Sequence, residues 1–429
     1  MADETDVDAA LIIRPVVQNY AWGVPGGGST SLVARMANAP PSDGTPFAEL
    51  WMGTHPKAPA VVLGAGAGGG DVEIGEFLAA HPSFHGKKVL DVFGLQLPYL
   101  FKILSVAKAL SIQAHPHKEL AERLHARDPN NYPDANHKPE LACAVSRFEG
   151  LCGFRPLPEI VKHLHEVPEL HGLVGPEAAS SLAAAAPGGD AEAQRGALKS
   201  AFAALMSSPT AEVDAAATAL VARLEALQPA GALSGADELV LRINVQFPKD
   251  IGLFNIYFLN HCVLEPGEAL FLGPNLPHAY LSGDCMEIMA TSDNVVRAGF
   301  TPKFKDVETL VEMLTYAHGP ASVLSGDEES PGVRLYAPPS SDFPEFSLRR
   351  VEVTSVPASL AASVAPRIAI VVSGEASISA TPREDASSVK PVTLAAKEGT
   401  VVLIAASAQL QLSGSGLVFI AACHPSFEA

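Results

Sequence analysis

Short apolar segments separated by turn residues fill most of residues 11–150 and the chain after about residue 320. In the C-terminal part, apolar or alternating segments recur at 346–353, 367–374, 376–380, 392–396, 400–406, 408–414 and 417–422. Short strands at such regular spacing are typical of a β-sandwich or barrel. The pattern therefore predicts a β-rich domain towards each end of the chain.

The middle of the chain has helical spacing instead. Three segments repeat apolar residues every three or four positions: 156–167, 191–208 and 210–228. The remaining expected elements are helices at 117–127 and 303–317 and strands at 239–247 and 254–264. Strand patterns thus resume after the helical segment, so this segment interrupts a β domain.

A chain of 429 residues is too long for one ordinary core, so we expect more than one domain. The patterns predict a mainly β protein with an α-helical insertion. The expected domains are a discontinuous first β domain carrying the chemistry, a helical insertion and a second β domain, at 1–154 with 235–320, at 155–234 and at 321–429.

Charge and cysteine content narrow the class of protein. The net charge of -18 argues against binding to nucleic acid or to anionic membranes. The five cysteines show no CxxC spacing and indicate free thiols in a reducing compartment. The acidic first residues lack the basic and apolar regions of a signal peptide, and no stretch approaches the about 20 apolar residues of a membrane span. We therefore expect a cytoplasmic protein.

Four residues stand out as candidate metal ligands. Gln113 and His115 follow an apolar run and are two positions apart, so on a strand they project from the same face. Glu140 lies in NHKPE and His278 in GPNLPHAY. Two imidazoles, one carboxylate and one amide oxygen form a mixed ligand set that suits a borderline divalent cation.

The sequence around these residues resembles a known family. PGEALFLGPNLPHAY is similar to the second motif of the cupin jelly roll, and QAHPH with Glu140 would stand for the first motif. More closely, a series of segments in one order resembles type I mannose-6-phosphate isomerase: QNYAWG, ELWMGTHP, SIQAHPHK, NHKPE, GLCGFRP, NLPHAY and SDNVVRAGFTPKFKDV. The resemblance runs from residue 18 to about 317 and is weaker through the alanine-rich helical segment.

The resemblance implies a fold, a metal and a reaction. It implies a catalytic cupin, a helical domain and a second cupin, and one zinc ion held by Gln113, His115, Glu140 and His278. The implied reaction interconverts D-mannose 6-phosphate and D-fructose 6-phosphate, so the expected partner is a hexose 6-phosphate. The expected role is the supply of mannose for GDP-mannose and glycan synthesis, by a protein that acts as a monomer.

This isomerisation moves a proton between C1 and C2 through an enediol or enediolate. Arg297 is always charged and would hold the developing oxyanion or the phosphate. A general base must reach C1 and C2, and both Glu287 and Lys138 are candidates. The remaining expected contacts are Ser111, Lys102 and Lys303 at the phosphate, and Asp293 and His137 at the substrate or behind the metal ligands.

Two other classes fit a cupin fold. A cupin oxygenase using Fe²⁺ would favour three histidines and one glutamate, and Gln113 in place of a histidine argues against it. A non-catalytic cupin that binds or stores sugar would need neither Arg297 nor Lys138 near the metal. Removal of the metal by chelation separates these classes: an isomerase would lose turnover, whereas a storage protein would lose at most some stability.

Overall fold

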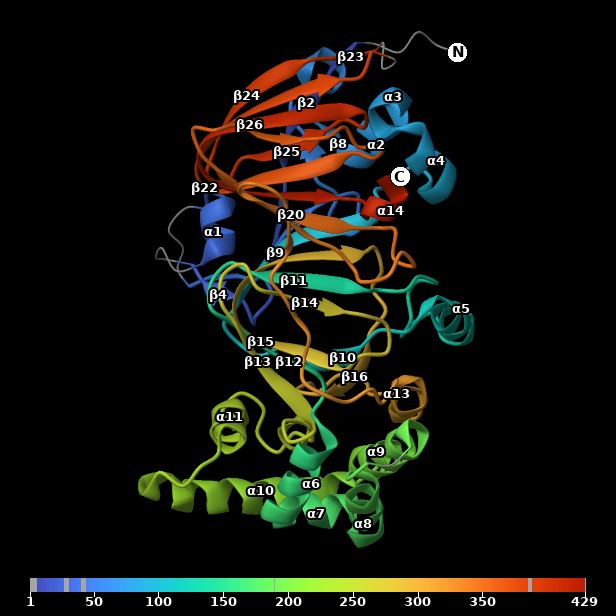
Figure 1. The fold of residues 1–429 in the computed structure, drawn as a ribbon, viewed down its shortest axis with the longest axis vertical. Helices are drawn as coiled ribbons and strands as arrows, with labels where there is room; N and C mark the ends of the chain where they lie inside the picture. The colour runs from blue at the N-terminus through green and yellow to red at the C-terminus, as the bar shows by residue number, and fades with distance from the viewer. Residues whose placement is uncertain (1–5, 27–30, 40–43, 189, 385–387, 429) are drawn as a thin grey trace.

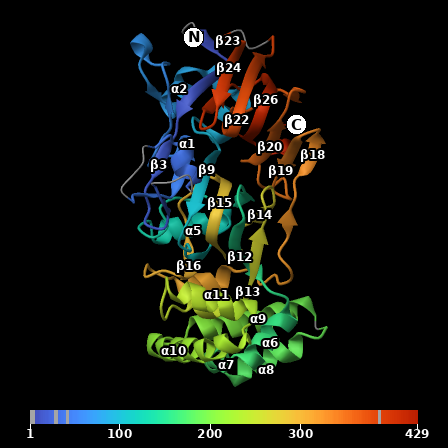
Figure 2. The same ribbon diagram turned by 90° about the vertical axis from the view of Figure 1, so that its left-hand side faces the viewer.

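The structure is a computed structural model that describes residues 6–26, 31–39, 44–188, 190–384 and 388–428. Its parts are stacked along the long axis of the molecule (Figure 1). The helical segment lies at one end, a first β region lies in the middle, and a second β region lies at the other end, as the turned view in Figure 2 also shows. The expected β-rich fold with a helical insertion is confirmed.

A single bent strand, β15 (His278–Ala290), closes the first β region. Its first half pairs with β12 (Phe148–Phe154) and its second half with β9 (Tyr99–Val106) and β11 (Glu140–Ala144). The bend lies at Gly283, whose φ of 103° and contact with the backbone of residue 147 leave no room for a Cβ. The two halves of β15 therefore belong to two walls that face each other.

Shorter strands complete these two walls. They are β3 (Val16–Gln18), β6 (Glu49–Met52), β10 (Ile112–Ala114), β13 (Leu259–Leu264), β14 (Ala269–Leu272), β16 (Val296–Gly299) and β17 (Val323–Leu324). β10 pairs with β16 and with the start of β15, so the end of β10 lies on the same wall as His278.

The second β region is built around two long strands, β22 (Arg367–Pro382) and β26 (Ala408–Ala422), which pair along their length. Each of them joins two segments that the sequence pattern predicts as separate strands. The other strands of this sheet are β2 (Ala10–Arg14), β7 (Val61–Val62), β8 (Val72–Glu73), β18 (Asp327–Ser330), β19 (Val333–Tyr336), β20 (Ser347–Val353), β21 (Ala358–Leu360), β24 (Val392–Lys397) and β25 (Val401–Ile404).

The N-terminal strands belong to this second sheet, which differs from the expected organisation. β2 pairs antiparallel with β25 on one side and with β7 on the other. Part of the segment 1–154, expected in the first β domain, is thus hydrogen-bonded to the C-terminal strands. The other limits of the expected domains stay a prediction.

The helices also differ in part from those expected. The helical segment contains α6 (Leu157–Glu166), α7 (Pro168–Val174), α8 (Pro176–Ala185), α9 (Ala191–Met206), α10 (Thr210–Leu227), α11 (Gly235–Asn244) and α12 (Gly252–Asn255). The strand predicted at 239–247 is wrong, because most of it lies in α11. This helix begins at a capping box in which Ser234 and Asp237 bond each other's backbone. Of the strand predicted at 254–264, the part at 259–264 is present as β13.

Helices outside this segment lie around the β regions. α5 (Lys118–Arg127) matches the expected helix, and α13 (Val307–Met313) is shorter than expected. The pattern gives no indication of four helices near the N-terminus: α1 (Leu32–Met36), α2 (Ile74–Ala80), α3 (Pro82–His85) and α4 (Lys87–Phe93). The remaining elements are β1 (Val7–Asp8) with β23 (Val389–Lys390), β4 (Val24–Pro25) with β5 (Pro46–Phe47), α14 (Pro425–Glu428), and the 3₁₀ turns η1 (Ala67–Gly69) and η2 (Gln228–Ala230).

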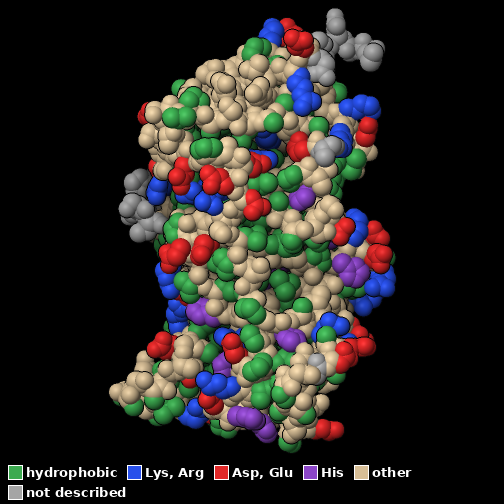
Figure 3. Space-filling model, viewed as in Figure 1, with side chains coloured by type: hydrophobic (Ala, Val, Ile, Leu, Met, Phe, Trp, Pro, Cys, Tyr) green, Lys and Arg blue, Asp and Glu red, His purple; other side chains and the backbone are tan. Residues whose placement is uncertain are grey.

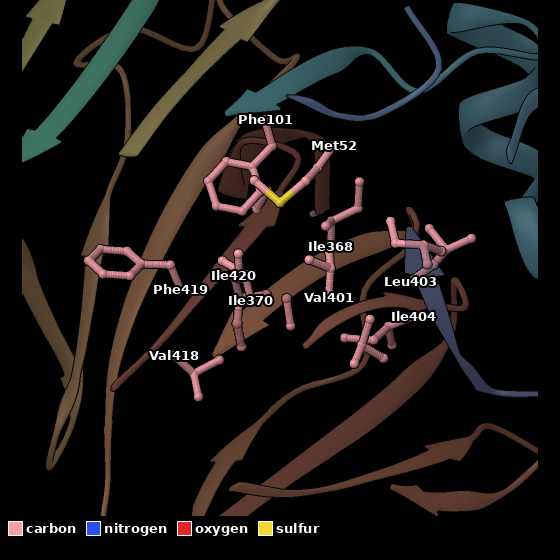
Figure 4. Packing of buried hydrophobic residues seen from close by; sticks show 14 of the residues in the cluster. Met52, Phe101, Ile368, Ile370, Val401, Leu403, Ile404, Val418, Phe419 and Ile420 are labelled. Atoms are coloured by element: carbon pink, nitrogen blue, oxygen red, sulfur yellow. The ribbon is translucent and has the colours of Figure 1, made fainter. Parts of the chain in front are cut away.

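One apolar core spans both β regions. Met52 and Phe101 of the first region belong to the same buried cluster as Ile368 and Ile370 of β22, and Figure 4 shows them close together. A second core joins the helical segment to the first β region, and in it the ring of Phe202 on α9 contacts the rings of Phe154 and Phe258. Burial of each such side chain contributes about 1.5–3 kcal/mol, so the packing holds the three parts together.

The surface in Figure 3 carries acidic and basic side chains interspersed with apolar ones. All five cysteines are buried and free, in agreement with the expectation of thiols rather than disulfides. In the described part of the chain, no helix is both long and apolar enough to cross a bilayer. Residues 1–5, on which the expected lack of a signal peptide partly rests, lie outside the described residues.

Candidate metal centre and active site

Three of the predicted ligands converge between the two walls of the first β region. His115 follows β10 and His278 begins β15 on one wall, while Glu140 begins β11 on the other. The Nε2 atoms of His115 and His278 lie 3.5 Å and 3.3 Å from the two carboxylate oxygens of Glu140. All three side chains are almost fully buried, and their ligand atoms lie within 4.8 Å of one another.

The opposite ring nitrogens fix the orientation of both imidazoles. Nδ1 of His115 lies 2.7 Å from the carbonyl oxygen of Asn294, and Nδ1 of His278 lies 2.9 Å from that of Leu276. Because a carbonyl only accepts a hydrogen bond, each Nδ1 must carry the proton. In the neutral ring, Nε2 then presents a lone pair, which is the arrangement that metal-binding histidines adopt.

The buried atoms at this point have no hydrogen-bond partner. Nε2 of His115, Nε2 of His278 and Oε2 of Glu140 all lack one among the described residues. Buried acceptors without a donor cost about 1–3 kcal/mol each, and more for a charged group. A divalent cation would satisfy all three at once, so the donor set fits a metal ion such as zinc.

Gln113 lies beside this group. Its Cα is the direct cross-strand partner of His278, so the two side chains project from the same face of the wall. On its other side Gln113 pairs with Arg297 of β16. The strand register thus places the predicted amide ligand between the histidine cluster and the predicted anion-binding arginine.

The backbone behind His115 is fixed by a polar network. Asn294, which is fully buried, donates from its side-chain nitrogen to the carbonyl oxygens of Asp134 and Asn136 at 2.7 Å and 2.9 Å. The carboxylate of Asp134 accepts from the hydroxyl of Ser292 at 2.8 Å and from the backbone N–H of residue 293 at 2.7 Å. These bonds tie the loop before Glu140 to the loop that holds His115.

Lys138 lies next to Glu140, with Nζ 3.0 Å from Oε1. Burial raises the pKa of the Glu140 carboxyl, but Lys138 and the two histidines outweigh burial and hold the pKa well below its usual value. Burial, assisted by the Lys138 charge, lowers the pKa of His115 to about 4. At neutral pH the group therefore contains a carboxylate and a neutral imidazole, the forms that bind metal.

Glu287 and Lys102 form a buried ion pair on adjacent strands. Lys102 Nζ lies 2.9 Å from Oε2 of Glu287 and 3.6 Å from Oε2 of Glu49. The hydroxyl of Tyr280 donates to Oε1 of Glu287 at 2.8 Å, and the indole N–H of Trp51 donates to Glu49. Lys102, expected at the phosphate, is thus held by two carboxylates, and the carboxylate of Glu287 is engaged through both oxygens.

Three of the expected anion contacts line one cavity of about 310 Å³: Ser111, Arg297 and Lys303. Trp22 forms another part of its wall. Arg297 and Lys303 take part in none of the ion pairs found among the described residues. Burial lowers the pKa of Arg297 from its very high ordinary value, and the guanidinium stays charged at neutral pH. The cavity therefore presents uncompensated positive charge.

The other two predicted contacts lie away from this cavity. Asp293 accepts from Lys57 at 2.7 Å and lies 3.5 Å from His55, whose hydrogen bond is the largest factor lowering the pKa of the Asp293 carboxyl. His137 bonds Glu345 at 2.6 Å and faces a different cavity of about 1080 Å³ between the two β regions. Neither residue lines the cavity of Arg297.

Sequence reasoning missed several polar residues that surround this site. His55, Glu49, Asp134, Asn294 and Tyr280 all lie in or near the resembling segments, but none has a spacing that indicates a ligand or a base. Their contacts are with residues far along the chain, such as Asp134 with Asn294. Only the folded structure reveals these contacts.

A β-rich, cupin-like fold with a buried His–Glu–His group and an adjacent cationic cavity defines the class of this protein: a cupin with a candidate metal centre. Residues 11–157 match the family model of the type I phosphomannose isomerase catalytic domain, and residues 173–259 match that of its helical insertion domain. The chain belongs to the type I phosphomannose isomerase family.

Individual relatives agree with this assignment. The chain is similar to mannose-6-phosphate isomerase of Bos taurus, with 48% identity over 79% of this chain and 81% of the relative. It is 41% identical to that of Emericella nidulans over 93% and 92% of the two chains. A solved zinc-bound mannose 6-phosphate isomerase matches with a TM-score of 0.80 and 29% identity, and a mutant phosphomannose isomerase from Salmonella typhimurium matches with 0.81 and 30%. Each solved match covers 97% of this chain and 100% of the other.

Proposed function

We propose that this chain is a zinc-dependent isomerase that interconverts D-mannose 6-phosphate and D-fructose 6-phosphate. The observation that carries the proposal is the set of three buried, unpartnered ligand atoms on His115, Glu140 and His278. The names of the relatives support the substrate, and the zinc-bound neighbour supports the metal. In this proposal the carbon skeleton stays intact and one proton moves between C1 and C2.

Gln113, His115, Glu140 and His278 would hold one zinc ion per chain. When bound, zinc would supply a Lewis acid that polarises oxygens at C1 and C2. The two histidines are already in the tautomer that offers Nε2, so little rearrangement is required. Buried Glu140 supplies the one negative ligand, which leaves net positive charge to meet an enediolate.

The cavity beside Gln113 suits the phosphate of the substrate. Arg297 and Lys303 provide two positive charges and Ser111 a hydroxyl, in a chain whose net charge is -18. A guanidinium matches a phosphate through two parallel hydrogen bonds. Because Arg297 pairs with Gln113, a phosphate held here would direct the sugar towards the ligand group.

Two residues stay candidates for the base that moves the proton. Glu287 is buried, and burial raises its pKa despite the opposing charge of Lys102, which is the direction that makes a carboxylate a stronger base. Lys138 lies closer to the ligand group, through its contact with Glu140. Tritium exchange between substrate C1 or C2 and water separates them: the Glu287→Gln or Lys138→Met variant that retains substrate binding but loses exchange identifies the base.

The wider role follows from the product. We propose that the enzyme supplies mannose 6-phosphate for GDP-mannose and glycan synthesis in the cytoplasm, and that it acts as a monomer. The support for this role is the activity named for its relatives. Sedimentation of the purified protein tests the monomer, because a dimer would double the mass of about 44.7 kDa.

A coupled assay tests the reaction and its metal dependence. Purified protein is assayed with mannose 6-phosphate before chelation, after chelation and after zinc is added back. The proposal predicts activity that disappears on chelation and returns with zinc. A fully metal-loaded protein without isomerase activity would contradict the reaction, and full activity in metal-free protein would contradict the role of the metal.

A further inference from the structure

Arg367, the first residue of β22, is a buried cation without a carboxylate partner. It is only 3% exposed, and none of the ion pairs found among the described residues includes it. Its Nη1 donates to the carbonyl oxygen of Ala361 at 3.1 Å and its Nη2 donates to that of Ala408, but Nε has no partner. A buried charge is costly unless it is paired, so this arginine requires an explanation.

A second arginine approaches from a neighbouring strand. Arg349 of β20 pairs with Ile420 of β26, and Ile420 pairs with Ala369 of β22. Ala369 and Arg367 are two residues apart, so Arg349 and Arg367 lie on the same face of the sheet. Burial first, and the charge of Arg349 second, lower the pKa of Arg367 to about 10. Two like charges therefore lie near each other at this end of the β region.

Both arginines line a cavity of about 280 Å³. The wall also includes Leu360, Ala361 and exposed Ser359, at the end of β21. The residues that line this cavity belong to the second β region, whereas the candidate metal ligands belong to the first. The volume is sufficient for a small anion with its nearest waters.

The two carboxylates in the wall are already occupied. Glu329 accepts Nε and Nη2 of Arg349 at 2.7 Å and 2.8 Å in a forked pair. Glu428 accepts from the hydroxyl of Ser363 at 2.6 Å and from the N–H of Val364 at 2.8 Å. The forked pair engages Nε and Nη2 of Arg349 but not its Nη1. Arg367 contacts no carboxylate among the described residues. The wall therefore holds two guanidinium groups and two carboxylates, and Arg367 forms an ion pair with neither carboxylate.

We propose that this cavity of the second β region is an anion site for a phosphate group, distinct from the isomerase centre. Donors from Arg367, Arg349 and Ser359 come from three different strands, so they approach from several directions. A tetrahedral oxyanion accepts hydrogen bonds from such directions, whereas a planar carboxylate is better matched by one guanidinium. Inorganic phosphate and the phosphate of a small ester share this chemistry.

Counting phosphate sites tests the proposal on the full, metal-loaded chain. Equilibrium dialysis with labelled inorganic phosphate should find two sites, one at Arg297 and one at Arg367. Arg297→Gln should remove only the first. Arg367→Gln and Ser359→Asp should each weaken the second at least tenfold, and Ser359→Asp should leave isomerase activity unchanged. Arg334→Gln on β19, an exposed arginine that bonds backbone carbonyls, is the matched control and should keep both sites.

The outcomes separate this proposal from the proposed function. A single site that disappears with Arg297→Gln would overturn the second site and leave the isomerase intact. Two sites that persist in Ser359→Asp would also overturn it, and this exposed substitution keeps the test valid if Arg367→Gln fails to fold. Displacement of label from the second site by fructose 6-phosphate assigns a phosphate ester as the ligand, and displacement by inorganic phosphate alone assigns the free ion.

Discussion

The two β regions have similar strand architecture but bury different side chains. On the strands and loops of the first region, the buried polar residues include Glu49, His55, Lys102, His115, Glu140, Glu149, His278, Glu287 and Asn294. In the sheet of the second region, the buried polar side chains on described strands are Ser347 and Arg367. The interior of the second region is otherwise made of Ile, Val, Leu, Phe and Ala, together with Tyr336 of β19.

This difference shows what separates chemistry from packing on a shared architecture. Polar groups cost free energy when they are buried, so a dense buried polar cluster indicates a site where they are needed. No group of His, Cys, Asp and Glu comparable to His115, Glu140 and His278 occurs elsewhere in the described ranges. The second region contributes apolar surface and holds the N-terminal strand β2, which supports a structural role.

The largest expected effect follows removal of the negative ligand. Glu140→Gln should lower isomerase kcat/KM about a thousand-fold or more, because it weakens metal binding and the charge that balances the site. The coupled assay and metal content by elemental analysis measure both effects. Glu352→Gln, on β20 of the second region and largely exposed, is the matched control and should match the wild type. If Glu140→Gln were as active as the wild type, the buried polar cluster of the first region would not be the site of the chemistry, and the contrast with the second region would have no basis.

The next effect concerns stability. Lys102→Met should lower the free energy of unfolding by about 3–5 kcal/mol, because it leaves the buried carboxylates of Glu287 and Glu49 without their cation. Denaturant titration measures the change. Lys87→Met, which breaks an exposed pair with Asp91, should cost less than about 1 kcal/mol. Similar losses in both variants would mean that burial of the Lys102 pair is unimportant.

A core substitution in the second region should separate stability from activity. Ile370→Ala removes a fully buried side chain of β22 and should cost about 2–5 kcal/mol of unfolding free energy. Isomerase kcat/KM per folded molecule should stay within about twofold of the wild type, because the strands that pair with β22 are β24, β25 and β26 of the second region. A large loss of kcat/KM at unchanged folded fraction would show that the second region shapes the active site.

The smallest expected effect is a pH dependence of stability, from the contact between β12 and α11 of the helical segment. The hydrogen bond from Arg242 of α11 is the largest cause that lowers the pKa of Glu149 to about 2, below the ordinary value of 4.5. A carboxyl whose pKa is lower in the folded than in the unfolded protein stabilises the fold at pH values above its unfolded pKa. This stabilisation is lost as the pH falls from about 4.5 towards 2. The melting temperature of wild type minus Glu149→Gln should therefore be larger at pH 7 than at pH 3. Glu166→Gln, at an exposed residue of α6, should show no such trend.

The sequence predicted the candidate ligand group because its signals are local. The spacing of Gln113 and His115 and the motif around His278 are visible in short segments, and the structure brings these residues together as expected. The long helices α9 and α10 were also predicted, since apolar residues recur at helical spacing over many turns. Signals of this kind need no knowledge of the rest of the chain.

The errors arose where distant residues or competing signals decide the structure. Segment 239–247 is rich in β-branched and apolar residues, but the capping box of Ser234 and Asp237 and the burial of Leu239, Val240 and Ile243 fit a helix. The pairing of β2 with β25 has no local signal. Lys102 stays a predicted phosphate contact, but its cross-strand partner on β15 is Glu287, a neighbour that only the strand register reveals.

The most direct test of the account is the position of the metal. A crystal structure of zinc-loaded protein, with anomalous scattering recorded at the zinc edge, should show one peak about 2.0–2.2 Å from Nε2 of His115, Nε2 of His278 and an oxygen of Glu140, with Gln113 completing the set. The second β region should show none. A peak elsewhere, or none between these side chains, would contradict the assignment of this cluster as the metal centre.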